Sequence, residues 1–110
     1  MGFLFFLKSE RQKIIEEFID GLKEYGVSFT REKSVIKSAS KTDGNWHDIV
    51  YAFAIKGNME GVTLVAEKQP KEEAVISFLQ KEGFSLDKAR IVFANIKPSS
   101  NESKLTGIPS

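Results

Sequence analysis

The stretch of residues 48–68, DIVYAFAIKGNMEGVTLVAEK, constrains the fold more than any other part of the chain. Apolar side chains fill both alternating sets of positions from residue 49 to residue 55, so a strand here would have two apolar faces. A strand of that kind lies inside a sheet, covered on both sides. The loop at residues 56–61 and the alternating residues 62–67 predict a second strand. We therefore expect a central β-hairpin.

The length of 110 residues fits one domain, and 41% hydrophobic with 28% charged residues is an ordinary globular composition. The 16 basic and 15 acidic side chains give a net charge of +1, without the excess of cations that general phosphate binding requires. Any nucleic-acid site must therefore be local. The absence of cysteine excludes disulfides, thiol nucleophiles and cysteine-type zinc sites.

Two helices are predicted. Ser9 and Gln12 have the spacing of an N-terminal cap, an apolar stripe follows at helical intervals, and Gly26 marks the end of the first helix. Pro70 marks the start of the second helix, with acidic residues at 72 and 73 in its first turn, and Gly83 marks its end.

The remaining segments favour strands. Residues 28–40 are mostly polar after the first two positions and predict a long, wet edge strand, followed by a hairpin turn at residues 41–45. Residues 90–97, RIVFANIK, predict the last strand. Residues 2–7, GFLFFL, fit either a short strand or the start of a helix.

These elements predict an α+β fold: a single small domain with a mostly antiparallel four- to five-stranded sheet packed against two helices. The order is a ferredoxin-like split βαβ arrangement, or α-β-β-β-α-β if residues 2–7 are helical. The second order resembles a double-stranded-RNA-binding domain in topology, but residues 67–73 lack the lysine-rich, glycine-led helix start of that family. We expect the domain to span residues 1–97 and residues 98–110 to be a flexible C-terminal tail.

A basic row is the one pattern that indicates a binding surface. The candidate surface comprises Arg31, Lys33, Lys37, Lys41, Trp46 and Tyr51. The four cations would share one parity of the edge strand, and the aromatic residues would lie on the strand paired with it. Such an arrangement can follow a phosphate backbone while a ring stacks on a base. The alternatives are a solvated strand edge and a site for an acidic protein surface.

Residues for catalysis are sparse. His47 is the only histidine, so a two-histidine metal site is impossible, and we expect neither a metal nor a cofactor. No strand–serine–helix elbow is present for a catalytic triad, and no glycine-rich segment has a phosphate-binding pattern. We expect a non-enzymatic protein.

The leading interpretation is a protein-interaction module of inhibitor, immunity or regulatory-adaptor type that binds a protein partner through its surface or a sheet edge. The alternative is a small RNA- or DNA-binding regulator that uses the basic strand 31–41. The same edge strand would also suit a homodimer. The apolar run at residues 3–7 is too short to span a membrane, so we expect a cytoplasmic protein.

Overall fold

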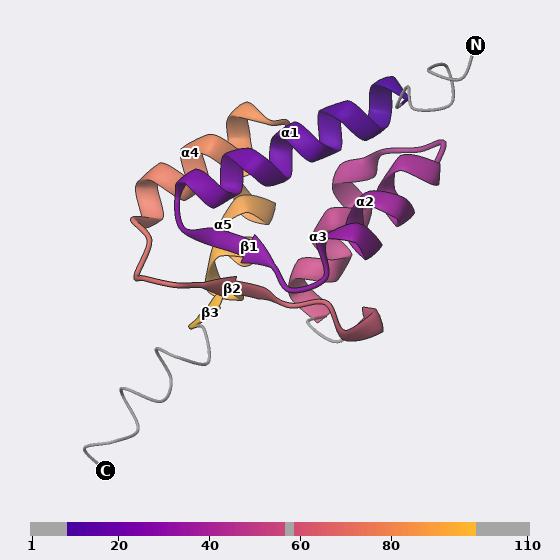
Figure 1. The fold of residues 1–110 in the computed structure, drawn as a ribbon. Coiled ribbons are helices and arrows are strands. Elements are labelled where there is room, and N and C mark those ends of the chain that lie inside the picture. The colour runs from indigo at the N-terminus through magenta and orange to yellow at the C-terminus, as the bar shows by residue number, and fades with distance from the viewer. Residues whose placement is uncertain (1–8, 57–58, 99–110) are drawn as a thin grey trace.

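Five helices and three short strands make up the part of the chain that the computed structural model describes, residues 9–56 and 59–98 (Figure 1). In chain order they are α1 (Glu10–Glu24), β1 (Val27–Phe29), α2 (Glu32–Lys41), α3 (Trp46–Lys56), the 3₁₀ turn η2 (Met59–Gly61), β2 (Leu64–Ala66), α4 (Glu72–Lys81), α5 (Leu86–Ala94) and β3 (Lys97–Pro98). The α2 and α3 helices pack against each other, as do α4 and α5. The α1 helix contacts both pairs.

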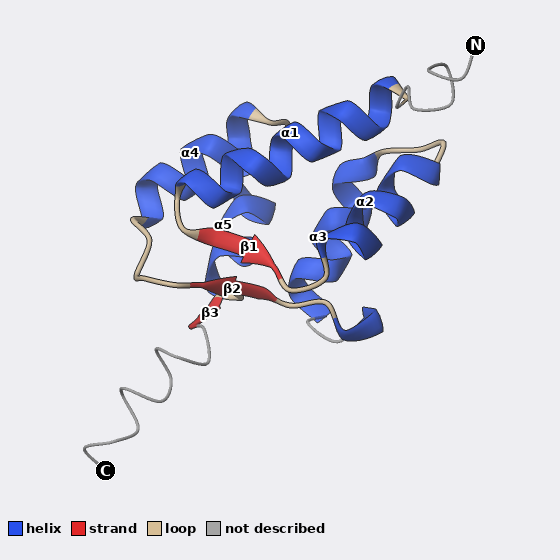
Figure 2. Cartoon of the chain, in the orientation of Figure 1, coloured by secondary structure: helices blue, strands red, loops and turns tan. Residues whose placement is uncertain are grey.

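The predicted fold class is wrong, because the described chain is mostly helical. Figure 2 shows three short strands beside the helices, where a sheet of four or five strands had been expected. The strand order is β1-β2-β3, with β1 and β2 antiparallel and β2 and β3 parallel. Val27 lies opposite Ala66, and Phe29 lies opposite Leu64. These four side chains are buried under the helices.

The predicted central hairpin is replaced by α3 and β2. A run that is apolar at every position does not distinguish a period of 2 from a period of 3.6, and its β-branched and aromatic residues favoured a strand. The buried residues of α3 are Trp46, Val50, Phe53 and Ala54, which are spaced at helical intervals. Asn45 begins this helix, because its side-chain oxygen accepts a hydrogen bond from the backbone nitrogen of His47.

The predicted edge strand is also wrong beyond its first residues. Only residues 27–29 form β1, and residues 32–41 form α2. The lysines of α2, at positions 33, 37 and 41, recur every four residues, and this interval places them on one face of either a strand or a helix. The buried Val35 and Ala39 keep the same interval and pack inward. The long edge for strand addition, and a homodimer built on it, are therefore absent from the described residues.

The last predicted strand is mostly α5. Ser85 caps this helix by accepting a hydrogen bond from the backbone nitrogen of Lys88, and only Lys97 and Pro98 form a strand. Pro98, which had been assigned to the tail, pairs with Ala66 at the end of β3.

Other predictions are confirmed. Ser9 caps α1 by accepting from the backbone nitrogen of Gln12, and Gly26 comes directly after that helix's C-cap with a φ of 80°. The α4 helix is present, although it begins at Glu72, two residues after Pro70. The assignments made for residues 2–7, 57–58 and 99–110 lie outside the described residues.

An aromatic cluster joins the two helical pairs through α1. The ring of Phe18 lies 5.2 Å from Trp46, 5.7 Å from Phe78 and 5.5 Å from Phe84, measured between ring centroids. Each of the three partners comes from a different segment: α3, α4 or the turn after α4. Phe18 itself is 1% exposed, so its ring lies within the core and links these three segments to α1.

Candidate functional site

Three lysines form a row on the outer face of α2. Lys33, Lys37 and Lys41 are exposed and follow one another at intervals of four residues. A rise of 1.5 Å per residue places successive members about 6 Å apart along the helix axis and the two ends about 12 Å apart. The opposite face of α2 is held in the core by Val35 and Ala39. We call these three residues the lysine row.

The lysine row is not neutralised within the described residues, where none of its three ammonium groups forms an ion pair. The neighbouring carboxylate of Glu32 is engaged elsewhere, because Lys23 of α1 lies 2.7 Å from it. The hydrogen bond that Lys23 donates to Glu32 raises the pKa of the Lys23 ammonium above its usual 10.5. The row therefore presents its positive charge to solvent.

A shallow groove of about 450 Å³ runs beside the lysine row, between α1 and α2. Its wall on α2 consists of the row itself with Ile36 and Ser40, and its wall on α1 consists of Gln12 and Glu16. The amide of Gln12 donates to the carboxylate of Glu16 at 3.2 Å. Lysine stems and Ile36 supply apolar surface, so the groove combines an apolar floor with a cationic rim on α2, while Glu16 supplies one carboxylate on the α1 side.

Arg31, the fourth cation of the predicted row, points elsewhere. Its guanidinium donates to the main-chain oxygen of Glu60 at 3.2 Å and lies 3.2 Å from the position of a Cβ built on Gly61. Glu60 has a φ of 52°, a left-handed conformation that is uncommon outside glycine. The side chain of Arg31 therefore holds the η2 turn.

Neither aromatic residue of the predicted site lies free beside the lysine row. Trp46 is 8% exposed and packs against Phe18 and the ring of His47. Tyr51 is half-buried, with the ammonium of Lys88 5.2 Å from its ring centre. The structure therefore brings together the three lysines of α2, but not the stacking platform expected with them.

The α2 and α3 helices are joined by residues 42–45, a short turn containing Gly44. Two helices joined in this way are typical of helix-turn-helix DNA-binding proteins, where the second helix enters the major groove. In this chain, every residue of α3 except Asp48 and Lys56 is buried or half-buried. The first turn of α3 also carries the negative charge of Asp48, which opposes phosphate. The α3 helix is therefore enclosed and cannot read DNA in that manner.

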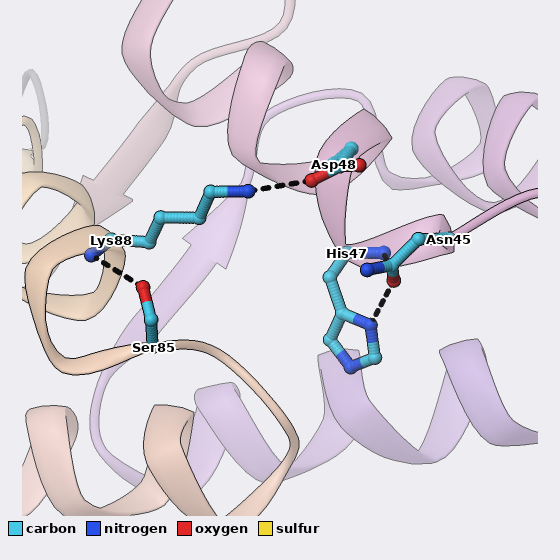
Figure 3. Close-up of polar contacts among 5 residues, drawn as sticks. All are labelled: Asn45, His47, Asp48, Ser85 and Lys88. Atoms are coloured by element: carbon cyan, nitrogen blue, oxygen red, sulfur yellow. Dashed lines mark hydrogen bonds and ion pairs between the residues drawn. The ribbon is translucent and has the colours of Figure 1, made fainter.

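Polar contacts cluster at the start of α3, where His47, the only histidine of the sequence, lies against Asn45, and Asp48 pairs with Lys88 (Figure 3). His47 Nε2 donates to the main-chain oxygen of Glu82 at 2.6 Å, and Nδ1 faces the side-chain oxygen of Asn45. Asp48 forms an ion pair of 2.6 Å with Lys88. These contacts tie the start of α3 to the α4–α5 turn and to α5.

The cluster around His47 lacks the contacts of a nucleophile and its base. The hydroxyl of Ser85 caps α5, and in the described residues no serine hydroxyl is hydrogen-bonded to His47. The described residues also contain no group of three or more His, Asp or Glu side chains placed to hold a metal ion. The contacts of this cluster connect α3 to the α4–α5 turn and to α5. That the protein is non-enzymatic stays a prediction.

Sequence reasoning missed the groove and the residues of α1 that line it. The sequence signal for the groove was the helical spacing of Val35, Ile36 and Ala39 relative to the lysines at 33, 37 and 41.

Within residues 9–56 and 59–98, no helix is both long enough and apolar enough to cross a bilayer.

No protein-family model, curated protein or solved structure matches this chain. The function must therefore be inferred from the surface that the fold presents.

Proposed function

We propose that the protein is a non-enzymatic interaction module whose lysine row and adjoining groove bind an acidic, amphipathic helix of a partner protein. The observation that carries this proposal is the set of three lysines at helical intervals beside a groove, none of which forms an ion pair with another described residue. The predicted docking through a sheet edge is replaced by docking through a helix face.

The chemistry of the site defines the partner. A helix in the groove would place carboxylates at intervals of four residues against the lysine row and apolar side chains against Ile36. Exposed charge pairs contribute little affinity, so the apolar strip has to supply most of it. The row would then steer association and select acidic partners.

A nucleic-acid ligand fits the same surface less well. Three cations neutralise about three phosphates, and neither Trp46 nor Tyr51, the two aromatic residues expected beside them in the described chain, is free to stack on a base. The enclosed α3 removes the usual element for reading the major groove. A single-stranded RNA held by the row alone would show a slope of about −2 in log affinity against log salt concentration.

Two matched variants test the proposal. In the row variant, all three lysines of the row are replaced by glutamine, which removes three charges and keeps a high helix propensity. The control variant makes the same replacement at three exposed lysines outside α2: Lys68, Lys71 and Lys81. Each protein is mixed with a helical peptide that carries glutamate at intervals of four residues beside a leucine stripe, and binding is followed by fluorescence anisotropy.

We expect the peptide to bind the unaltered protein and the control variant alike and to lose at least tenfold in affinity for the row variant. Affinity capture from a lysate of the host, with quantitative mass spectrometry, should identify acidic proteins that the row variant alone fails to retain. Equal behaviour of the two variants would refute the proposal. RNA binding with a salt slope of about −2, abolished only in the row variant, would assign the surface to nucleic acid instead.

A further inference from the structure

The dipeptide Asp–Gly occurs twice in the sequence, and the structure places its two copies in different surroundings. Asp20–Gly21 lies inside α1, whereas Asp43–Gly44 lies in the turn that joins α2 to α3 (Figure 1). Aspartate followed by glycine is especially prone to isomerise, because glycine has no side chain to hinder attack by its own backbone nitrogen. The two copies therefore allow one reaction to be compared in a turn and in a helix.

The copy in the turn meets the conditions for this reaction. Asp43 and Gly44 are both exposed, and a Cβ built on Gly44 has no atom within 4 Å. Within the described residues, the backbone nitrogen of Gly44 donates no hydrogen bond and the carboxylate of Asp43 forms no ion pair. No described neighbour therefore restrains the two reacting groups, and they can turn toward each other.

The copy in α1 lacks this freedom. Attack requires the Cα–C bond of the aspartate to rotate until the next nitrogen faces its side chain, and a helix fixes that bond at a ψ of about −42°. The nitrogen of Gly21 is also held in the hydrogen-bonded interior of α1. The ring of Phe78 covers Gly21, since a Cβ built there would lie 2.6 Å from its Cζ. Asp20 is therefore held away from reaction, although its side chain is 74% exposed.

We propose that Asp43–Gly44 is a site of spontaneous isomerisation to isoaspartate, with water as the only co-reactant, and that α1 protects Asp20–Gly21. The Gly44 nitrogen bonds to the side-chain carboxyl carbon of Asp43, and its proton leaves with the carboxyl hydroxyl as water. The resulting five-membered imide then adds one water. Opening at the main-chain carbonyl breaks the original peptide bond, so the chain afterwards runs through the Asp43 side chain. This reaction does not depend on binding by the lysine row.

The contacts of the turn determine what the isomerisation changes. The main-chain oxygen of Gly44 accepts a hydrogen bond of 3.0 Å from Nη1 of Arg11, which ties the turn to α1. The side-chain oxygen of Asn45 accepts from the backbone nitrogen of His47 at the start of α3. Isoaspartate adds one carbon atom, the Cβ of Asp43, to the main chain ahead of both contacts. We therefore expect the isomerised turn to release Arg11 and to loosen the first turn of α3.

Peptide mapping with electron-transfer fragmentation measures isoaspartate at each pair after the full chain has been kept near pH 6 and at about 37 °C for about four weeks. We expect at least tenfold more isoaspartate at Asp43 than at Asp20. In guanidinium chloride, where α1 is unfolded, the two pairs should react at similar rates. That result would show that α1, and not the flanking sequence, protects Asp20.

Gly44→Ala is the matched variant, because its methyl group hinders attack and meets no described atom within 4 Å. It should lower isoaspartate at Asp43 at least tenfold and leave the circular dichroism unchanged. In the isomerised form, separated by chromatography, amide hydrogen exchange should be at least tenfold faster in the first turn of α3. Folded protein that forms no isoaspartate at Asp43 while the unfolded chain reacts, or forms equal amounts at both pairs, would overturn the proposed site. An isomerised form that exchanges as slowly as the unaltered protein would overturn the effect on α3.

Discussion

Replacing Gly21 with alanine sets two known effects against each other, and the structure decides which is larger. Glycine inside a helix costs about 1 kcal/mol relative to alanine, so helix propensity predicts that the variant is more stable. However, a Cβ built on Gly21 lies 2.6 Å from Cζ and 2.7 Å from Cε1 of Phe78. Both distances are far shorter than van der Waals contact.

The ring of Phe78 is confined by its other contacts. It stacks on Phe18 with 5.7 Å between ring centroids and packs against Tyr25 with 5.4 Å. Overpacking of this kind costs roughly 1–3 kcal/mol. Taking about 2 kcal/mol for the clash and about 1 kcal/mol for the gain in propensity, we expect Gly21→Ala to destabilise the domain by about 1 kcal/mol. The melting temperature should fall by about 4–8 °C.

Urea unfolding followed by circular dichroism measures the free energy of unfolding. Gly44→Ala is the control, because a Cβ there has no atom within 4 Å, and its effect should stay within about 0.5 kcal/mol. In a Phe78→Leu background, the clash is relieved and Gly21→Ala should become neutral or stabilising. A Gly21→Ala variant that is more stable than the unaltered protein would refute the close packing of α1 against α4.

Three further changes test other contacts. Phe53→Ala should cost roughly 3–5 kcal/mol in urea unfolding, because this side chain is 2% exposed at the centre of α3. His47→Ala should cost about 1–3 kcal/mol, since it leaves the Glu82 carbonyl without its ring donor, and amide hydrogen exchange should rise first in the α4–α5 turn. Glu32→Gln should lower the pKa of Lys23 in an NMR titration. Because the pKa of Lys23 is raised in the folded state, its ion pair with Glu32 stabilises the fold at neutral pH, by no more than about 0.5 kcal/mol. This contribution is lost as the pH rises past 10.5 and through the raised pKa of Lys23.

The parts of the fold that could be predicted from the sequence are those with a local signal. Ser9 as a cap and Gly26 and Gly83 after helices act within one turn of chain, and the structure keeps all three. Gly26 and Gly83 nevertheless lead into different elements, since β1 follows Gly26 and α5 follows Gly83. The local stop signal therefore does not specify the type of the next element.

The parts that could not be predicted depend on tertiary contacts. Residues 46–56 are enclosed by neighbouring elements, so their apolar side chains show no periodicity, although eleven residues is long for a strand and ordinary for a helix. The lysines of α2 were recognised as a group, but their interval of four suited both structures. Only the packing of Val35 and Ala39 decided in favour of a helix and placed the groove beside it.

The separation of roles between α2 and α3 is a consequence of their surroundings. The α3 helix packs against α2 and α5 and exposes only Asp48 and Lys56, so substitutions along it will act mainly on stability. The α2 helix buries only Val35 and Ala39 and leaves its lysines in solvent, so substitutions of those lysines can change binding without opening the core. A net charge of +1 conceals this arrangement, because it averages the lysine row with acidic side chains on the outer face of α1. For this reason the charge of the α2 face, and not the charge of the whole chain, is the quantity on which the proposed binding depends.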